Sequence, residues 1–299
     1  MIETIGIVGQ GFVGNSVKEG FKDHYKVHTF DIRPTLSTVS LPNLVHYSDI
    51  VFVCLPTPMN SSGQCDVSNL EETLGLINDY NKPMPVLIKS TVPPGTTDRF
   101  VSQFTNLNVI FNPEFLTEAN AVADYKNQTR IILGVNDKSA TEVITVFNKV
   151  FPKASVIKTR ASVAEMVKYA TNCFLATKVS FANEMSQICR QLDIDYDKVV
   201  EYAKYDKRLG YSHWSVPGPD GDFGYGGHCF PKDIAALKYL ANELGVDTTV
   251  LDGTIKKNNE VRLNRDWESQ VGRAVTEDYT SKIFDPTAGP SADRGVSDK

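Results

Sequence analysis

The first 160 residues alternate short apolar runs with longer amphipathic stretches, and this alternation constrains the fold more than any other feature. The apolar runs are rich in Val and Ile, as expected for strands buried on both faces of a parallel sheet. Segments with helical periodicity, such as 68–80 and 139–151, lie between them. The pattern predicts an α/β fold with a doubly wound parallel sheet. The expected strands are 4–9, 26–31, 50–55, 85–90, 108–111, 130–135 and 155–158.

The pattern changes near residue 160, where about thirty residues read as one continuous helix. At 1.5 Å per residue such a helix is on the order of 45 Å long, more than one small domain uses. Ser162 followed by Glu165 predicts a capping box at its start. We expect residues 161–190 to be shared with a second copy of the chain. Further helices are expected at 194–204, 231–245 and 249–264.

A glycine motif, Gly9-x-Gly11-x-x-Gly14, directly follows the first expected strand and begins a helix. In a Rossmann-like dinucleotide site these glycines make a tight turn, let a pyrophosphate approach the backbone and allow close packing of helix and strand. Asp31 follows about 20 residues later, where a carboxylate binds a ribose 2′-hydroxyl and favours NAD over NADP. Arg33 could instead pair with a 2′-phosphate. A packing turn without a ligand is the alternative.

Residues 224–233 read GYGGHCFPKD and place the thiol of Cys229 after three glycines. Pro231 suits the first turn of a helix, so Cys229 is expected just before one. A helix N-terminus and the neighbouring Lys232 both favour a thiolate, which can attack an aldehyde carbonyl. Asp233 supplies a carboxylate for proton transfer. The alternative is a buried structural cysteine, which is our interpretation of Cys54, Cys173 and Cys189.

Two further pairs of polar residues are candidates for a site. Lys168 and Asn172 lie four apart in the long helix and share a face, where a cation and an amide could stabilise an oxyanion. Glu114 and Glu118 follow an expected strand, at the edge where α/β sheets bind ligands. A solvated helix face and an ordinary helix start are the alternatives for the two pairs.

Together these stretches resemble the UDP-glucose/GDP-mannose dehydrogenase family over about residues 1–265. The resemblance is most specific in NPEFLTE (112–118) and GYGGHCFPKD (224–233). It implies an NAD-dependent, four-electron oxidation of the C6 alcohol of a nucleotide sugar, such as UDP-glucose to UDP-glucuronate. The other matching stretches are GIVGQGFVG, VCLPTP, KSTVPPGT and EMVKYATNCFLATKVSFANE.

The resemblance also implies a role for each candidate residue. Cys229 would hold the substrate as a thiohemiacetal and then as a thioester. Lys168 and Asn172 would stabilise the oxyanion, Asp233 would support proton transfer, and Glu114 would take part in thioester hydrolysis. Thr91, Glu118 and Lys232 would join the three glycines and Asp31 in the cofactor site, and Phe115, Arg208 and Gly226 would bind substrate. Arg208 would reach the substrate of a partner subunit.

The implied organisation has three parts. Residues 1–160 would form the NAD-binding domain, 161–265 a small all-α central domain that makes a homodimer through the 161–190 helix, and 266–299 a disordered tail. Typical members of the family continue with a further domain for the nucleotide part of the substrate, and the chain leaves no room for it. The resemblance therefore leaves open which sugar and which nucleotide are bound.

Composition narrows the expected partners. A net charge of −5 without a long basic run argues against nucleic acid. No apolar run approaches the ~20 residues that span a bilayer, and the chain begins with a strand-like segment rather than a signal peptide. The five cysteines are odd in number and have no zinc-site spacing, so we expect reduced thiols, no metal and a cytoplasmic enzyme.

Two other functions compete with this interpretation. A two-electron β-hydroxyacid dehydrogenase would also pair a dinucleotide fold with a helical domain in about 300 residues, and would use a lysine and an asparagine like Lys168 and Asn172. Such an enzyme needs no thiol, so Cys229 and the stretch 112–118 would be unexplained. A non-catalytic NAD-binding protein is the third possibility.

Overall fold

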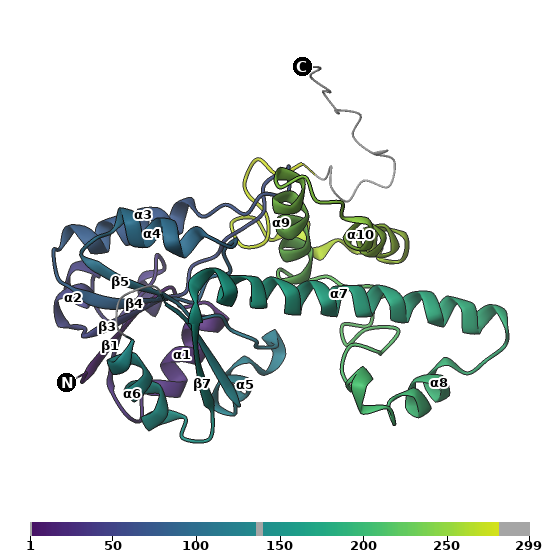
Figure 1. Ribbon diagram of the computed structural model, residues 1–299, viewed down its shortest axis with the longest axis horizontal. Helices are drawn as coiled ribbons and strands as arrows, with labels where there is room; N and C mark the ends of the chain where they lie inside the picture. Colours follow the sequence, from purple (N-terminus) through teal and green to yellow (C-terminus); the bar gives the residue numbers. More distant parts are fainter. Residues whose placement is uncertain (1, 136–139, 281–299) are drawn as a thin grey trace, which may run out of the picture. The chain divides into compact units, whose positions relative to one another are not determined.

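The computed structural model describes residues 2–135 and 140–280 and divides the chain into two compact units. The sheet unit comprises residues 1–57 and 66–170. Among the described residues, the helical unit comprises 58–65 and 171–280. Helix α7 (Ala161–Gln191) begins in the first unit and continues into the second (Figure 1).

The sheet unit is built on seven strands in the order β2-β1-β3-β4-β5-β6-β7. The pairings are parallel except that of β5 with β6, where Phe111 faces Gly134 in an antiparallel bridge. The predicted α/β class is confirmed, with this one antiparallel contact as a departure from an all-parallel sheet. The strands are β1 (Thr4–Val8), β2 (Lys26–Phe30), β3 (Ile50–Val53), β4 (Met84–Ile88), β5 (Leu107–Phe111), β6 (Arg130–Val135) and β7 (Ser155–Arg160).

Helices cover both faces of this sheet (Figure 1). In β3, Val51 and Val53 belong to one apolar cluster, which includes side chains of α2, α3 and α4, whereas Ile50 and Phe52 belong to a second cluster with α1, α5 and α6. Because both faces are buried, the central strands read as continuous apolar runs. The helices are α1 (Phe12–Phe21), α2 (Leu41–Tyr47), α3 (Ser68–Asp79), α4 (Thr96–Gln103), α5 (Ala121–Lys126) and α6 (Thr141–Val150).

The start of α7 differs from the sequence prediction. The helix begins at Ala161, directly after β7, so Ser162 is already its second residue and the predicted capping box is wrong. The buried carboxylate of Glu165 instead accepts hydrogen bonds from the backbone N–H of Gly95 (2.6 Å) and from the N–H (2.8 Å) and hydroxyl (2.6 Å) of Thr97. Burial raises the pKa of Glu165, against the effect of these hydrogen bonds. Glu165 therefore satisfies backbone groups at the start of α4.

The helical unit adds α8 (Tyr196–Ala203), α9 (Phe230–Glu243) and α10 (Thr249–Val261) to the second part of α7. Its apolar core includes Met59, Ile234, Ile255 and Trp267. None of the helices among the described residues has both the length and the apolar character needed to cross a membrane.

The expected disordered tail, 266–299, is ordered over its first part. Trp267 and Val275 are fully buried, and the backbone of Met59 exchanges hydrogen bonds with Ala274 (2.9 Å) and Thr276 (3.0 Å). The side chains of Trp267, Ala274 and Val275 belong to the core of the helical unit, whereas Val271 is exposed. Residues 281–299 lie outside the described part of the chain.

Candidate active site

The glycine turn after β1 has the geometry of a dinucleotide cradle. Gly9 has φ +87°, and a Cβ there would overlap the carbonyl of Cys54. A Cβ at Gly14 would overlap the carbonyl of Gly9. A Cβ at Gly11 would meet nothing within 4 Å, so the backbone is open to an approaching pyrophosphate. The residues at this turn therefore fit the predicted cofactor.

Asp31, at the end of β2, is tied to the same turn. Its Oδ2 accepts the backbone N–H of Gln10 (2.7 Å), and its Oδ1 accepts the backbone N–H and the Nε–H of Arg33 (both 2.9 Å). Burial alone would raise the pKa of Asp31, but the hydrogen bonds from Arg33 and Gln10 outweigh it and lower that pKa. The carboxylate is thus ionised, and it engages the guanidinium of Arg33, the group that could have selected NADP.

The loop after β5 forms a cluster with α7, which we call the glutamate cluster: Lys89, Asn112, Glu114 and Lys168. The ammonium of Lys168 donates to Glu114 Oε1 (2.8 Å) and to the Glu114 carbonyl (2.7 Å), and both side chains are buried. Burial would raise the pKa of Glu114, but Lys168, the amide of Leu116 and the nearby Lys89 outweigh it and lower that pKa. The cluster holds one ionised carboxylate with both oxygens engaged.

Lys89 is a member of this cluster that sequence reasoning missed. Its buried Nζ lies 3.1 Å from Asn112 Oδ1 and 3.4 Å from the Pro113 carbonyl. Burial lowers the pKa of Lys89 to about 8, although Cys54 and Glu114 act in the opposite direction. A signal was available, because a lysine directly after an apolar strand is expensive to bury and stood at the head of the KSTVPPGT stretch.

Other predicted residues of the sheet unit lie around these two features. The Thr91 carbonyl accepts the hydroxyl of Thr57 (2.7 Å), and Thr91 is almost fully buried. Phe115 lies beneath two cations, the Arg130 guanidinium at 4.4 Å and the Lys168 ammonium at 5.6 Å from the ring centre. Glu118 is exposed and begins the short helix η2 (Glu118–Asn120).

In the helical unit a second cluster forms at the start of α9, which we call the cysteine cluster: Asn172, Cys229, Lys232 and Asp233. Cys229 is the N-cap residue of α9, and its carbonyl accepts the backbone N–H of Asp233 (3.0 Å). The Asp233 carboxylate accepts the Lys232 ammonium on Oδ1 (2.6 Å) and the Asn172 amide on Oδ2 (2.6 Å). Burial would lower the pKa of Lys232, but Asp233, Cys65 and Cys229 together raise it. A fixed positive charge therefore lies near the Cys229 thiol.

Cys173 and Cys229, both in the helical unit, differ in environment. Cys173 is buried in the apolar core, and burial, reinforced by Asp233, raises the pKa of its thiol well above the ordinary value. Cys229 is only half-buried and lies at a helix start. The contrast separates a structural thiol from one with access to a reactant.

The lysine and asparagine of α7 bind different carboxylates. Lys168 pairs with Glu114, whereas Asn172 pairs with Asp233. Their spacing predicted a common helix face, but each has its hydrogen-bonding partner on a different element. Among the described residues, no group of three or more His, Cys, Asp or Glu side chains could hold a metal ion.

The remaining two predicted substrate residues lie elsewhere in the helical unit. Gly226 packs against Arg262 and Asp266, whose side chains a Cβ at this position would overlap. Arg208, in the short helix η3 (Lys207–Leu209), is paired with Asp206, and its side chain is 88% exposed.

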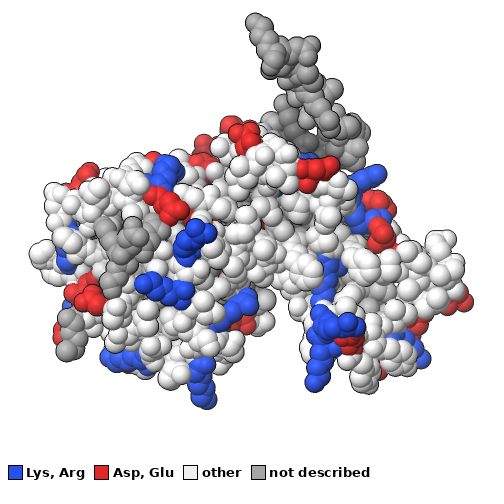
Figure 2. Space-filling view, viewed as in Figure 1, with Lys and Arg blue, Asp and Glu red and all other residues white. Residues whose placement is uncertain are grey.

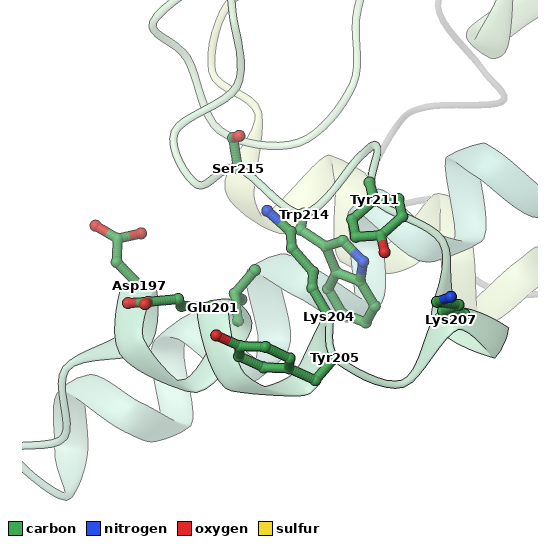
Figure 3. A pocket seen from close by; sticks show the side chains of 9 residues that line it. Asp197, Glu201, Lys204, Tyr205, Lys207, Tyr211, Trp214 and Ser215 are labelled. Carbon is green, nitrogen blue, oxygen red and sulfur yellow. The ribbon is translucent and has the colours of Figure 1, made fainter.

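A cavity of about 480 Å³ lies beside the Arg208 segment rather than at Cys229 (Figure 3). Its lining includes the rings of Tyr205, Tyr211 and Trp214 together with charged side chains of α8 and the residues after it, such as Glu201 and Lys204. Figure 2 shows basic and acidic side chains interspersed over the visible face, rather than gathered by sign. The residues that line this cavity belong to neither of the two clusters that carry candidate chemistry.

Comparison with known proteins places these clusters in a family. Residues 34–152 match the NAD binding domain of the UDP-glucose/GDP-mannose dehydrogenase family, and residues 162–260 match its central domain. The chain is 33% identical over 253 residues to the UDP-glucose 6-dehydrogenase TuaD of Bacillus subtilis, covering 82% of this chain and 53% of that protein. The chain spans about half the length of the curated relatives it matches.

Solved structures agree on the fold. A UDP-glucose dehydrogenase from Pyrobaculum islandicum aligns with a TM-score of 0.77 at 27% identity, over 87% of this chain and 68% of that one. The 3-hydroxyisobutyrate dehydrogenase of Mycobacterium tuberculosis aligns with a TM-score of 0.67 at 16% identity, over 90% of this chain and 94% of that one, which shows a shared fold alone. The chain therefore belongs to the UDP-glucose/GDP-mannose dehydrogenase family and carries its NAD binding domain and its central domain.

Proposed function

We propose that the protein catalyses the NAD-dependent, four-electron oxidation of the C6 alcohol of a nucleotide sugar, with UDP-glucose to UDP-glucuronate as the first candidate reaction. The observation that carries the proposal is the cysteine cluster, in which half-buried Cys229 occupies the N-cap position of α9, one turn before a buried Lys232–Asp233 ion pair. A two-electron oxidation would have no use for such a thiol. The names of the relatives support the substrate class.

The sheet unit would hold the cofactor. The turn of Gly9, Gly11 and Gly14 receives the pyrophosphate, and Asp31 binds the adenine ribose. When bound, NAD supplies the oxidising power by accepting one hydride in each of two oxidation steps. Thr91, Glu118 and Lys232 are assigned to the cofactor site from the family resemblance.

In the first oxidation the substrate loses a hydride from C6 and a proton from the hydroxyl oxygen, which leaves an aldehyde. The negative charge that develops on this oxygen needs fixed donors. We assign this role to Lys168 and Asn172, which are four residues apart on the continuous helix α7 and whose charge and orientation are set by Glu114 and Asp233.

In the second oxidation the Cys229 thiolate forms a C–S bond to the aldehyde carbon as the C=O π bond breaks, and the oxygen takes up the proton that the thiol lost and becomes the hydroxyl of a thiohemiacetal. Loss of the second hydride and of the hydroxyl proton gives a thioester. Water then adds to the carbonyl carbon, the C–S bond breaks, and the thiolate leaves beside the ammonium of Lys232. Glu114 is ionised and is assigned as the base that accepts the proton of this water.

A homodimer through α7 is part of the proposal. Phe174, Phe181 and Ile188 recur every seven residues along α7, and each is exposed. A stripe of large apolar side chains on one helix face favours a second helix as its partner. In such a dimer Arg208 would serve the substrate of the partner subunit. A cytoplasmic location stays a prediction.

The test is a count of NADH released per molecule of nucleotide sugar consumed, across UDP- and GDP-linked sugars. Two NADH per sugar support the four-electron reaction, and one supports a β-hydroxyacid-type dehydrogenase. No NADH at any sugar concentration, from a chain that still binds NAD, supports the non-catalytic alternative and overturns the proposal.

A further inference from the structure

The segment that leads into Cys229 is held by side chains rather than by regular secondary structure. Residues 218–227 form turns, bends and irregular backbone, and seven of these ten residues are glycines or aspartates, which add little apolar packing. Their contacts come mainly from α10 and from the residues that follow it. The position of the thiol therefore depends on a small number of polar contacts.

Arg262, the C-cap residue of α10, is the centre of these contacts. Its side chain is 2% exposed, and its guanidinium donates to the Asn264 carbonyl (2.7 Å), to Asp220 Oδ2 (2.6 Å) and to Asp266 Oδ1 (2.9 Å). Asp222 lies 3.5 Å from Nε. Burial would lower the pKa of Arg262, but Asp220 and Asp266 raise it, so the group stays charged at every accessible pH.

Asp266 links the side chain of Arg262 to the backbone just before Cys229. While Oδ1 binds Arg262, Oδ2 accepts the backbone N–H of Gly227 at 2.9 Å, two residues before Cys229. The approach is so close that a Cβ on Gly226 would overlap both the guanidinium and the carboxylate. The absence of a side chain at Gly226 is thus a condition for the contact.

Asn258, one turn earlier on α10, makes a second contact of the same kind. Its Oδ1 accepts the Tyr225 N–H (2.7 Å) and its Nδ2 donates to the Tyr225 carbonyl (3.0 Å). A Cβ on Gly224 would overlap the Asn258 side chain. The backbone is therefore held at two points: Asn258 of α10 binds residue 225, and Asp266, which follows α10, binds residue 227.

We propose that Arg262 and Asp266 form a positioning pair that fixes the backbone entering Cys229 and so aims its thiol for reaction. The proposal rests on the proposed function for its catalytic consequence, but not for its structural content. Neither residue touches reacting atoms; both act through Gly227. If the pair only stabilised the fold, loss of either carboxylate partner of Arg262, Asp220 or Asp266, would have the same effect on the segment before Cys229.

The experiment compares Asp266→Ala with Asp220→Ala in the full chain. Both variants remove a carboxylate bound to Arg262, so both disturb the same guanidinium. Asp266 also holds Gly227, whereas Asp220 ties the segment nine residues before Cys229. Removal of Arg262 itself would strand three carboxylates, so its partners are changed instead.

Amide hydrogen exchange followed by mass spectrometry is the first readout and needs no substrate. Asp266→Ala should speed exchange in the peptide 224–229 by at least about tenfold, and Asp220→Ala should leave that peptide within about twofold of the parent protein. Equal exchange in the two variants, or no change in either, overturns the proposal.

Turnover is the second readout. Asp266→Ala should lower kcat at least about tenfold with an unchanged KM for NAD and an unchanged Tm, and Asp220→Ala should stay within about threefold. Faster exchange with an unchanged kcat overturns the positioning role. A parent protein that turns over no nucleotide sugar defeats the proposed function, and the exchange comparison then decides alone whether the pair fixes this segment.

Discussion

The two clusters each hold one buried carboxylate but surround it with different charge. In the glutamate cluster, Glu114 is bound by Lys168 and has Lys89 nearby, so two cations serve one anion. In the cysteine cluster, Asp233 is bound by Lys232 and the neutral amide of Asn172, so the charges balance. The first arrangement suits the stabilisation of negative charge on a substrate oxygen. The second is neutral until a thiol ionises, and it then gains an anion beside Lys232.

The largest effect is expected at the thiol. Cys229→Ser should lower acid formation by at least about 10³-fold, because a hydroxyl beside Lys232 cannot replace the thiolate nucleophile. NAD binding, which we assign mainly to the glycine turn and Asp31, should be unchanged by calorimetry. Cys189→Ser, a buried cysteine outside both clusters, is the matched control. An unaltered rate of acid release from the Cys229 variant would remove the thioester mechanism.

The next largest effect is expected in the glutamate cluster. Lys168→Met should lower kcat by about 10²- to 10³-fold and destabilise the protein by about 3–5 kcal/mol, because it leaves Glu114 buried beside fewer donors. The double variant with Glu114→Gln should recover much of that stability in urea unfolding but none of the activity. If the double variant is as unstable as the single one, the pair is not the source of the loss.

Lys89→Met tests the lowered pKa of Lys89, the second cation of the glutamate cluster, through the pH dependence of stability. The folded protein holds Lys89 with a pKa of about 8, below the ordinary lysine value, so the unfolded chain binds more protons between about pH 8 and 10.5. The parent protein should therefore gain stability relative to the variant as pH rises through this window, by up to on the order of 3 kcal/mol. Urea unfolding of both proteins at pH 7.5 and pH 10 measures the gain. A stability difference that is equal at the two pH values would contradict the shifted pKa.

The smallest effect is expected at the cofactor turn. Asp31→Ala should weaken NAD binding by about tenfold and narrow the preference over NADP, because the ribose loses its acceptor and Arg33 loses its partner. Labelling of Cys229 by iodoacetamide should be unaffected, which separates the two units. Slower labelling in this variant would show that the cofactor turn and the cysteine cluster are coupled before substrate binds.

Much of the fold was readable from the sequence. All seven expected strands are present. The central strands are buried on both faces and so leave continuous apolar runs, and the start of α9 followed from Pro231. The hydrogen-bond partners of the site residues could not be predicted from the sequence. Spacing showed that Lys168 and Asn172 share a helix face, but a one-dimensional pattern does not say which side chain of another element lies opposite each of them.

The same limit explains the other errors. Ser162 and Glu165 have the spacing of a capping box, yet a helix that follows a strand without a loop has no N-cap position for Ser162 to occupy. Lys89 was passed over because a single lysine after a strand has no periodicity. The expected tail begins at residue 266, although the side chains of Trp267 and Val275 are buried in the core of the helical unit.

The segment 58–65, which contains Met59, has a practical consequence for dividing the chain. Residues 58–65 interrupt the sequence of the sheet unit and belong to the helical unit, where Met59 forms a bridge with Val275; a second bridge, from Met59 to Cys65, closes the segment on itself. A fragment that ends at residue 170 would keep residues 58–65 but lose the residues that bury them. The apolar side chain of Met59 would then be exposed and would favour aggregation of the fragment. Dissection of the protein into separately expressed halves should therefore replace 58–65 with a short polar linker rather than merely truncate the gene.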